Sequence, residues 1–254
     1  MNTKKNKLTA LIITYNEVNH IDDVIKNIDF TDEIIVVDSF SNDGTYQKLL
    51  KHKHVITKQR VFKNFADQRN YALSLATHNW ILFIDADERI TKKLKNEILL
   101  TIEKSTNTVG FMVKRLYYFN KKRIRFSGFQ SDTTYRLFKK SYVKYIEHKI
   151  VHEQPQLNGE SMLLKNHMLH YCFDNGAHYK AKMEHYATLK ATELNAKGKK
   201  YHILKLLFRP IYKFIINYFM RLGFLDGKAG FIICYLSAYG VYYRYKTLKK
   251  LNTY

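Results

Sequence analysis

The sequence predicts an α/β protein in which a mostly parallel sheet is followed by a helical, basic C-terminal region. Over residues 1–105, short apolar segments alternate with segments whose apolar residues recur at helical spacing, which is typical of a parallel sheet covered on both faces. Lys and Arg number 43 against 22 Asp and Glu, for a formal charge of +21. From residue 197 onward, basic residues alternate with apolar and aromatic ones, and Asp226 is the one acidic residue.

The first 105 residues predict four strands, each followed by a helix. The strands are short runs rich in apolar and β-branched residues: 8–15 (LTALIITY), 33–38 (EIIVVD), 54–62 (HVITKQRVF) and 80–85 (WILFID). The expected helices are residues 17–27, 46–51, 67–76 and a segment capped by Thr91. Asp67 is expected near the N-cap of the third helix. The apolar face of the fourth is predicted to be Leu94, Ile98 and Ile102.

Size and composition limit the class of protein. At 254 residues, with 46% apolar residues and two prolines, the chain can bury the core of one large or two small domains. Cys172 and Cys234 match no metal or redox spacing, which favours a reducing, cytoplasmic compartment. The basic start and short apolar run resemble a signal peptide, but the run leads into Asn16 and Glu17 without a small-residue cleavage site, so we interpret it as a strand. The charge indicates a polyanionic partner: nucleic acid, an anionic membrane or a phosphorylated substrate.

Polar residues follow three of the expected strands directly, at residues 15–16, 38–39 and 85–87. Ligands of parallel sheets bind beyond the carboxyl ends of the strands, so these positions predict one site. A single carboxylate at such a point commonly caps the next helix instead. Asp85 and Asp87 after a fully apolar strand are more specific, because alternate strand residues point the same way. Two parallel carboxylates suit a Mg²⁺ or Mn²⁺ ion that also touches phosphate oxygens.

The segment WILFIDADERIT places three carboxylates, those of Asp85, Asp87 and Glu88, within four positions. Like charges at this spacing repel one another. The sequence therefore predicts a positive group between them.

Three segments resemble the nucleotide-binding half of glycosyltransferase family 2 in order and spacing: LIITYNEVNHIDDVIKNI, DEIIVVDSFSNDGT and QRNYALSLATHNWILFIDADE. Within that family the chain resembles the lipopolysaccharide-core β-glucosyltransferase branch, and TYRLFKK, VHE and FMRLGFLDGKAGF extend the resemblance over most of the chain. The resemblance implies a GT-A-type, Rossmann-like fold with a glycosyltransferase domain at 1–175 and a helical, basic, membrane-associating region at 176–254. The domain would divide into a nucleotide-sugar half, 1–105, and an acceptor half, 106–175.

The resemblance implies an inverting, metal-dependent hexosyltransferase. It would move a sugar from a nucleotide-sugar donor, a UDP-sugar first of all, to a cell-envelope glycan or glycolipid acceptor such as lipopolysaccharide core. The nucleotide-sugar-binding residues implied by motif position are Thr14, Tyr15, Asn16, Glu17, Asp38, Arg69, Asp85, Ala86 and Asp87. Asp38 would contact the base or ribose and Asp85 the sugar or ribose. Metal and basic side chains would stabilise the departing nucleoside diphosphate.

The metal ligands implied for Mg²⁺ or Mn²⁺ are those of the DxD motif. Asp87 would be the principal ligand, with Asp85 beside it. His170, in MLHYC, is a candidate for an additional metal or phosphate contact. A lone histidine is more commonly structural, so both interpretations of His170 stay open.

Inversion requires a carboxylate that takes the proton of the acceptor hydroxyl. In the family this acid follows the strand that corresponds to YRLFKK, residues 135–140. Glu153, in VHE, is the first candidate, and Asp132, just before the strand, is the rival; a structural role for both is the third possibility. The usual acidic pair is absent, since His152 precedes Glu153, and this leaves the assignment open.

The C-terminal region predicts two or three helices, with Pro210 near a helix start and breaks at Gly223 and Gly227. Its longest uncharged stretch, 229–243, is shorter than the roughly 20 residues that span a bilayer. We therefore expect helices that lie in the headgroup region of an anionic membrane, on the cytoplasmic face of the inner membrane. The alternative is an ordinary helical subdomain with a solvated basic face.

Two other classes of protein remain open. A nucleic-acid-binding α/β protein without catalytic activity would explain the charge and the 20 Tyr and 16 Phe residues. Because the sequence has no nucleic-acid-binding motif and the basic residues lie mostly outside the α/β segment, no nucleic-acid partner is expected. A phosphatase-like enzyme would use DADER as nucleophile and acid, but such sites carry Thr where this chain has Arg89.

Overall fold

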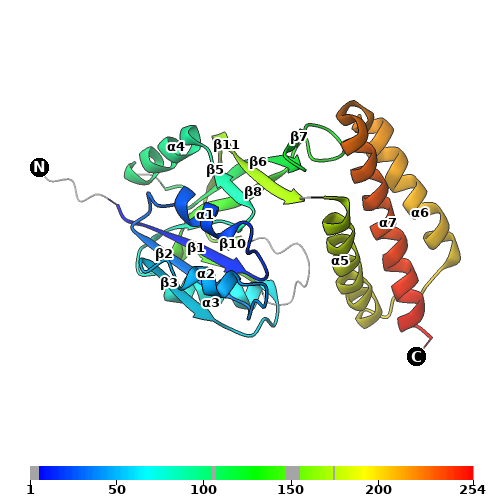
Figure 1. The fold of residues 1–254 in the computed structure, drawn as a ribbon, viewed down its shortest axis with the longest axis horizontal. Helices are drawn as coiled ribbons and strands as arrows, with labels where there is room; N and C mark the ends of the chain where they lie inside the picture. Colours follow the sequence, from blue (N-terminus) through cyan, green and yellow to red (C-terminus); the bar gives the residue numbers. More distant parts are fainter. Residues whose placement is uncertain (1–5, 105–106, 147–154, 174, 254) are drawn as a thin grey trace, which may run out of the picture. The chain divides into compact units, whose positions relative to one another are not determined.

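The computed structural model describes residues 6–104, 107–146, 155–173 and 175–253. It is an α/β protein with a helical C-terminal region, as predicted (Figure 1). The chain forms two compact units, Met1–Arg115 with Thr133–His170, and Leu116–Asp132 with Tyr171–Tyr254. Two of the three boundaries fall inside long strands, β6 (Gly110–Phe119) and β11 (Ser161–Phe173), and the third lies between Asp132 and Thr133. The domain limits drawn from the sequence at residue 175 stay a prediction.

Four parallel strands form the first half of the sheet, in the spatial order β3-β2-β1-β4. They are β1 (Leu8–Thr14), β2 (Glu33–Asp38), β3 (Val55–Gln59) and β4 (Trp80–Phe83). Thr14 of β1 pairs with Asp38 of β2, so these two strands end side by side. This confirms the parallel arrangement expected from the continuous apolar runs.

Later strands extend the sheet beyond β4 in the order β8-β6-β11-β5. β8 (Thr133–Lys139) is antiparallel to both β4 and β6, and β5 (Glu88–Ile90) is antiparallel to β11. The remaining short elements of this unit are η1 (Lys140–Tyr142), β9 (Val143–Lys144) and β10 (Gln156–Leu157). The antiparallel β8 brings residues from the middle of the chain beside the end of β4.

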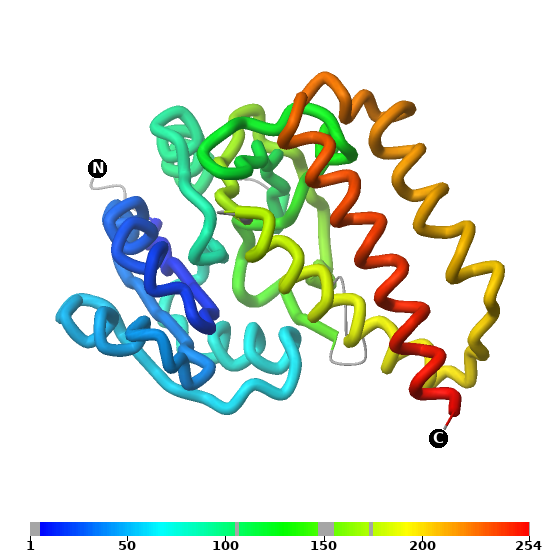
Figure 2. Tube along the Cα trace, turned by 45° about the vertical axis from the view of Figure 1, so that its right-hand side comes forward, coloured from blue at the N-terminus to red at the C-terminus, as the bar shows by residue number. Residues whose placement is uncertain are grey.

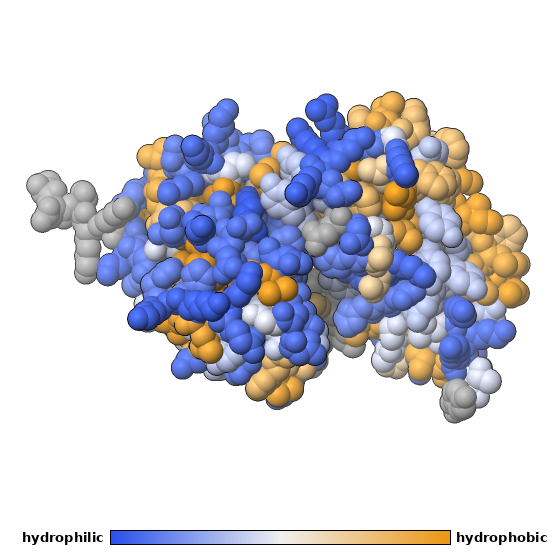
Figure 3. All heavy atoms as spheres, in the orientation of Figure 1, coloured by the Kyte–Doolittle hydropathy of each residue, from blue (hydrophilic) through white to orange (hydrophobic). Residues whose placement is uncertain are grey.

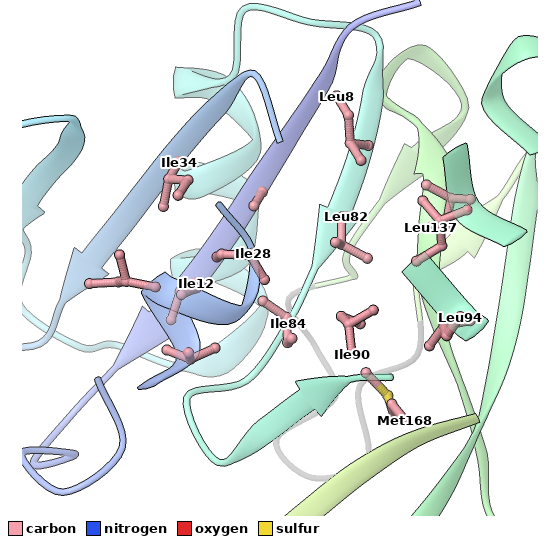
Figure 4. Close-up of a cluster of buried hydrophobic side chains, with 14 of the residues drawn as sticks. Leu8, Ile12, Ile28, Ile34, Leu82, Ile84, Ile90, Leu94, Leu137 and Met168 are labelled. Carbon is pink, nitrogen blue, oxygen red and sulfur yellow. The ribbon is translucent and has the colours of Figure 1, made fainter. Parts of the chain in front are cut away.

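Apolar side chains cover both faces of the parallel strands. Figure 4 shows one cluster, in which Ile12, Ile34 and Leu82 of three strands meet Leu94 of a helix. Their sequence neighbours, such as Leu11 and Ile35, belong to a second cluster on the other face. The helices of this unit are α1 (Ile21–Asn27), α2 (Thr45–Leu49), α3 (Phe65–Leu75) and α4 (Lys92–Glu103). Burying both faces is what makes these strands uninterrupted apolar runs.

Helix ends agree with the cap signals of the sequence. Thr91 caps α4, where its side chain accepts a hydrogen bond from the Leu94 amide at 3.2 Å. Asp67 lies in the first turn of α3, and its amide donates to the Asn64 side chain at 2.8 Å. Leu94, Ile98 and Ile102 are buried, as predicted for the apolar face of α4.

Several elements are shorter than expected; β3, for example, was expected to reach residue 62 and ends at Gln59. β4 ends at Phe83, and residues 84–87 form a turn in which the Glu88 amide donates to the Asp85 carbonyl at 3.0 Å. The carboxylates of Asp85 and Asp87 therefore leave a turn and not a strand, which corrects the argument from strand alternation. The helix expected at 17–27 begins at Ile21.

The second unit holds β7 (Lys122–Ile124), paired with β6, and three long helices within its described residues. The helices are α5 (Gly176–Ala196), α6 (Ile203–Ile215) and α7 (Gly227–Leu251), with the short segments η2 (Ile216–Met220) and η3 (Gly223–Asp226) before α7. α7 lies between α5 and α6 (Figure 2). Pro210 lies inside α6 and not near its start, which corrects that expectation.

Close packing joins η3 to α7. A Cβ on Gly230 would lie 2.0 Å from the Gly223 carbonyl oxygen, so only glycine allows this approach. A core that includes Tyr117, Tyr179 and Ile233 lies between the hairpin β6–β7 and the helices. Among the described residues, none of the helices has the length and apolar character to cross a membrane.

Candidate active site

The loop after β1 is fixed by side chains of the loop after β2. Asn16 has a left-handed backbone (φ 58°), and its amide donates to the Ser41 hydroxyl at 2.8 Å. The next amides, of Glu17 and Val18, donate to Thr45 at 2.8 Å and Asp43 at 3.0 Å. These hydrogen bonds tie the loop before α1 to the side chains of residues 41–45. The two loops thus form one rigid edge beyond the parallel strands.

Asp38 is buried beneath this edge. Its carboxylate accepts hydrogen bonds from the Ser41 amide and the Gln59 side chain, both at 3.0 Å, and from the Ser41 hydroxyl. The described contacts of Asp38 therefore hold the loop in shape, and its contact with a base or ribose stays a prediction. Above it, Tyr15 is exposed. The buried Thr14 hydroxyl has no hydrogen-bond partner among the described residues.

A buried arginine separates the carboxylates that follow β4. Arg136, on β8, donates to Asp85 and, at 2.6 Å, to Glu88. Arg136 is 1% exposed and Glu88 0%. Arg69, on α3, lies 3.5 Å from the other Asp85 oxygen, and Arg115, on β6, lies 3.5 Å from Glu88. Three arginines thus provide positive charge for two of the three carboxylates of this segment, those of Asp85 and Glu88.

These charges stabilise each other's ionised forms. Burial alone would raise the pKa of Asp85, but Arg136 and Arg69 outweigh it and lower that pKa to about 2. Burial alone would lower the pKa of Arg136, and the carboxylates of Asp85 and Glu88 raise it instead. Asp85 and Arg136 are both charged throughout the physiological pH range.

Asp87, the second aspartate of the motif, contacts a histidine. Its Oδ2 lies 3.2 Å from His170 Nε2, and both residues are buried. Two ligands of one ion, each about 2.1 Å from it and at right angles, are about 3 Å apart, so this pair fits a divalent cation. The described residues contain no ready-made cluster of three His, Cys, Asp or Glu ligands.

The comparisons with known proteins agree with this arrangement. The family model of Glycosyl transferase family 2 matches residues 9–159, more than half of the chain. The chain belongs to glycosyl transferase family 2. The protein is therefore a glycosyltransferase.

Relatives of this family 2 glycosyltransferase cover almost its whole length. It is 28% identical to an uncharacterized glycosyltransferase of Rickettsia conorii over 96% of the chain and 90% of the relative. It is 27% identical to the lipopolysaccharide core biosynthesis glycosyltransferase LpsC of Rhizobium meliloti, over 96% of the chain and 95% of LpsC. The similarity to LpsC therefore confirms the resemblance to the lipopolysaccharide-core branch.

Solved structures show the same fold. Staphylococcus aureus TarS 1–349 in complex with UDP-GlcNAc matches with a TM-score of 0.51 at 15% identity, over 91% of this chain and 90% of that one. The mannosyltransferase PcManGT of Pyrobaculum calidifontis, in complex with GDP-Man and Mn²⁺, matches with a TM-score of 0.50 at 15% identity, over 76% and 66%. These likenesses confirm the GT-A fold predicted for the glycosyltransferase.

The structure brings some of the predicted site residues together. Asp85 and Arg69 meet in the arginine network, and Ala86 lies in the turn, where its carbonyl accepts from Arg89 at 2.7 Å. Asp132 lies in the second unit and accepts from the Tyr117 hydroxyl at 2.8 Å. Glu153 lies outside the described residues.

Arg136 and Arg115 were not predicted as site residues. Arg136 stands in the segment TYRLFKK, which marked a strand, and nothing local to it indicates burial among carboxylates. The available signal was the repulsion between the carboxylates of residues 85–88, which required a cation without naming one. Only the antiparallel pairing of β4 with β8 identifies it.

Proposed function

We propose that this family 2 glycosyltransferase is an inverting, metal-dependent hexosyltransferase. It moves a sugar from a nucleotide-sugar donor, with a UDP-sugar as the first choice, to a cell-envelope glycan or glycolipid acceptor of the lipopolysaccharide-core type. The similarity to LpsC over nearly both whole chains supports this class of acceptor. TarS and PcManGT were solved with UDP-GlcNAc and GDP-Man, which makes a nucleotide sugar the natural donor to test.

The proposal rests on one observation: the two aspartates of the DxD motif have different partners. Asp85 is held by arginines, and Asp87 faces His170. In the proposal, Asp87 and His170 hold Mg²⁺ or Mn²⁺, which supplies positive charge to the diphosphate leaving group. Asp85, ionised and fixed by Arg136, orients the hydroxyls of the sugar or ribose. Arg69, whose guanidinium lies 3.5 Å from Asp85, adds positive charge beside the diphosphate.

The transfer itself requires a base. The acceptor oxygen attacks the anomeric carbon from the face opposite the diphosphate, the bond from that carbon to the diphosphate breaks, and the base takes the acceptor proton. We assign Glu153 to this role first, with Asp132 as the rival. Glu153 follows the strand that ends at Lys139, which is where the family places its acid.

We also propose a peripheral position on the cytoplasmic face of the inner membrane, against anionic lipid, with no nucleic-acid partner. A lipid-anchored acceptor would make such a position useful. The support is the basic and aromatic C-terminal region, which has one acidic residue from 197 onward.

A thermal-shift and hydrolysis panel tests the proposed donor and metal. UDP- and GDP-sugars are added with Mn²⁺, with Mg²⁺ or with excess EDTA, and an RNA oligomer serves as the polyanion control. We expect one nucleotide sugar with Mn²⁺ to raise the melting temperature and to be slowly hydrolysed. Stabilisation by the RNA and by none of the sugars would contradict the proposal.

A further inference from the structure

Helix α6 turns an apolar face outward. Leu204, Leu207, Phe208, Ile211 and Ile215 follow the i, i+3, i+4, i+7 and i+11 spacing of one helix face, and all five are exposed. None of the residues of α6 is buried. A helix that only covers a core points such a face inward. The outward orientation therefore requires a partner that removes these side chains from water.

The apolar face continues into the turn between α6 and α7. Its exposed apolar residues there are Phe219, Met220, Leu222, Phe224 and Leu225. Figure 3 shows apolar side chains gathered over α6 and the adjoining end of α7. Together these ten residues form what we call the insertion face. A soluble monomer rarely exposes a contiguous apolar patch of this kind without a function for it.

The turn is held in a defined shape. The buried Asp226 carboxylate accepts hydrogen bonds from the amides of Arg125 at 2.9 Å and Phe126 at 3.0 Å, and from the Ser127 hydroxyl at 2.9 Å. The Gln130 side chain donates to the Arg221 carbonyl at 2.8 Å. The apolar residues of the turn are therefore presented by a fixed support, which is the hairpin β6–β7 and the loop that follows it.

The charges around the insertion face have one sign. Lys205, Arg209, Arg221 and Lys228 are exposed along α6 and the turn. The only acidic residue from 197 onward is Asp226, which is buried and engaged with the hairpin. The surface around the face is thus cationic, with no carboxylate of this region to offset it.

The hairpin supplies a second cationic group. Lys121, Lys122, Arg123 and Arg125 are exposed there. Lys122 also donates to the Asp226 carbonyl at 3.4 Å, which joins the hairpin to the apolar turn. The basic rim therefore includes residues some 80 or more positions before α6, outside the C-terminal region that composition marked as basic.

We propose that the insertion face lies in the headgroup and acyl boundary of an anionic phospholipid bilayer, with the rim of the hairpin bound to lipid phosphates. An apolar helix face bordered by cations is what an interfacial helix requires. A second copy of the chain would cover the face but would place two cationic rims together. This inference deepens the membrane attachment of the proposed function, and it can be tested without any sugar transfer.

Vesicle co-sedimentation of the full-length protein tests the apolar part. The vesicles are phosphatidylcholine alone or mixed with phosphatidylglycerol. The test variant, Phe208→Glu with Ile211→Glu, changes residues that are 63% and 57% exposed. The matched control, Leu100→Glu with Leu50→Glu, changes residues of the other unit that are 65% and 59% exposed. We expect the first pair to lower the partition coefficient on mixed vesicles at least about tenfold and the control to lower it less than about twofold. Equal losses in both pairs would overturn insertion.

Charge-matched variants test the rim. Lys121→Gln with Arg123→Gln removes two charges from the hairpin, and Lys92→Gln with Lys93→Gln removes two exposed charges from α4. We expect the hairpin pair to weaken binding to mixed vesicles at least about threefold more than the α4 pair, and neither pair to change the weak binding to phosphatidylcholine. Equal effects of the two pairs would overturn the assignment of the hairpin.

Insertion depth is measured directly with a tryptophan introduced at one position of the insertion face. The one native tryptophan, Trp80, is 4% exposed, so brominated acyl chains should not quench it. Phe208→Trp should be quenched by them and Leu100→Trp should not. A concentration-dependent dimer that Phe208→Glu with Ile211→Glu dissolves, with no quenching of Phe208→Trp, would assign the face to a second copy instead. Donor hydrolysis in solution should be unchanged in all these variants, which separates this inference from the proposed transfer.

Discussion

Replacing Arg136 by methionine should destabilise the protein far more than a surface substitution does. The variant leaves Asp85 and the fully buried Glu88 side by side without the guanidinium that binds both. Breaking a buried ion pair by removing one partner costs about 3–5 kcal/mol, because a buried charge is left uncompensated. At about 2–4 °C per kcal/mol for a chain of this size, the melting temperature should fall by about 10 °C.

The pH dependence of that loss distinguishes charge from packing. In the wild-type protein, Asp85 has its pKa lowered from 3.8 to about 2, so its stabilising contribution, about 2 kcal/mol, is present above pH 3.8 and lost as pH falls towards 2. Without Arg136, burial opposes the ionised form of Asp85 and only Arg69 and Arg115 still favour it, so the pKa of Asp85 should be higher in the variant than in the wild-type protein. The stability deficit of Arg136→Met should therefore shrink as the pH falls.

Urea unfolding followed by circular dichroism at pH 7 and pH 5 measures both effects. Arg123→Met, on the exposed hairpin, is the matched control and should change the free energy of unfolding by less than about 0.5 kcal/mol. Adding Glu88→Gln to Arg136→Met should restore more than about 1 kcal/mol, because one of the two carboxylates that lost Arg136 is gone. A pH-independent deficit with no rescue by Glu88→Gln would refute the electrostatic account.

Three further outcomes are expected. Asp87→Asn should abolish turnover and the Mn²⁺-dependent thermal shift with an unchanged circular dichroism spectrum, and activity retained in excess EDTA would refute the metal role. Glu153→Gln should lower turnover roughly 10²- to 10⁴-fold, while donor affinity, measured by calorimetry, is nearly unchanged. If Asp132→Asn is inactive and Glu153→Gln is active, the two roles must be exchanged. Wild-type protein bound to anionic vesicles should be partly released by about 0.5 M salt, since about 1 kcal/mol per basic residue is electrostatic, and equal binding to neutral vesicles would exclude that contribution.

The parallel half of the fold could be predicted because its signals are local. A run such as residues 34–37 (IIVV) is apolar at consecutive positions because both faces of the strand are covered, and Thr91 caps its helix through a residue three positions away. The shape of the loop before α1 could not be predicted in the same way. It depends on hydrogen bonds from the Asn16 and Glu17 amides to side chains about 25 positions later in the chain.

The site was predicted in part for a similar reason. The need for a cation near Asp85 follows from the sequence, but its identity as Arg136 depends on a strand pairing across 51 positions. Periodicity also shows that α6 has an apolar face without showing which way the face points. The basic composition of the region indicated an electrostatic membrane surface, whereas the structure presents apolar side chains with the cations around them.

The position of Arg136 has a consequence for building chimeric enzymes. The carboxylates belong to the segment after β4, whereas their cation comes from β8, on the other side of the division between donor and acceptor halves that the sequence predicts at 105/106. A hybrid that joins residues 1–105 to the acceptor half of another family member will leave Glu88 buried without its counterion unless the incoming strand carries an arginine in the same register. Recombination points for this enzyme are therefore better placed after Lys139 than at residue 105, even though the latter looks like the natural seam in the sequence.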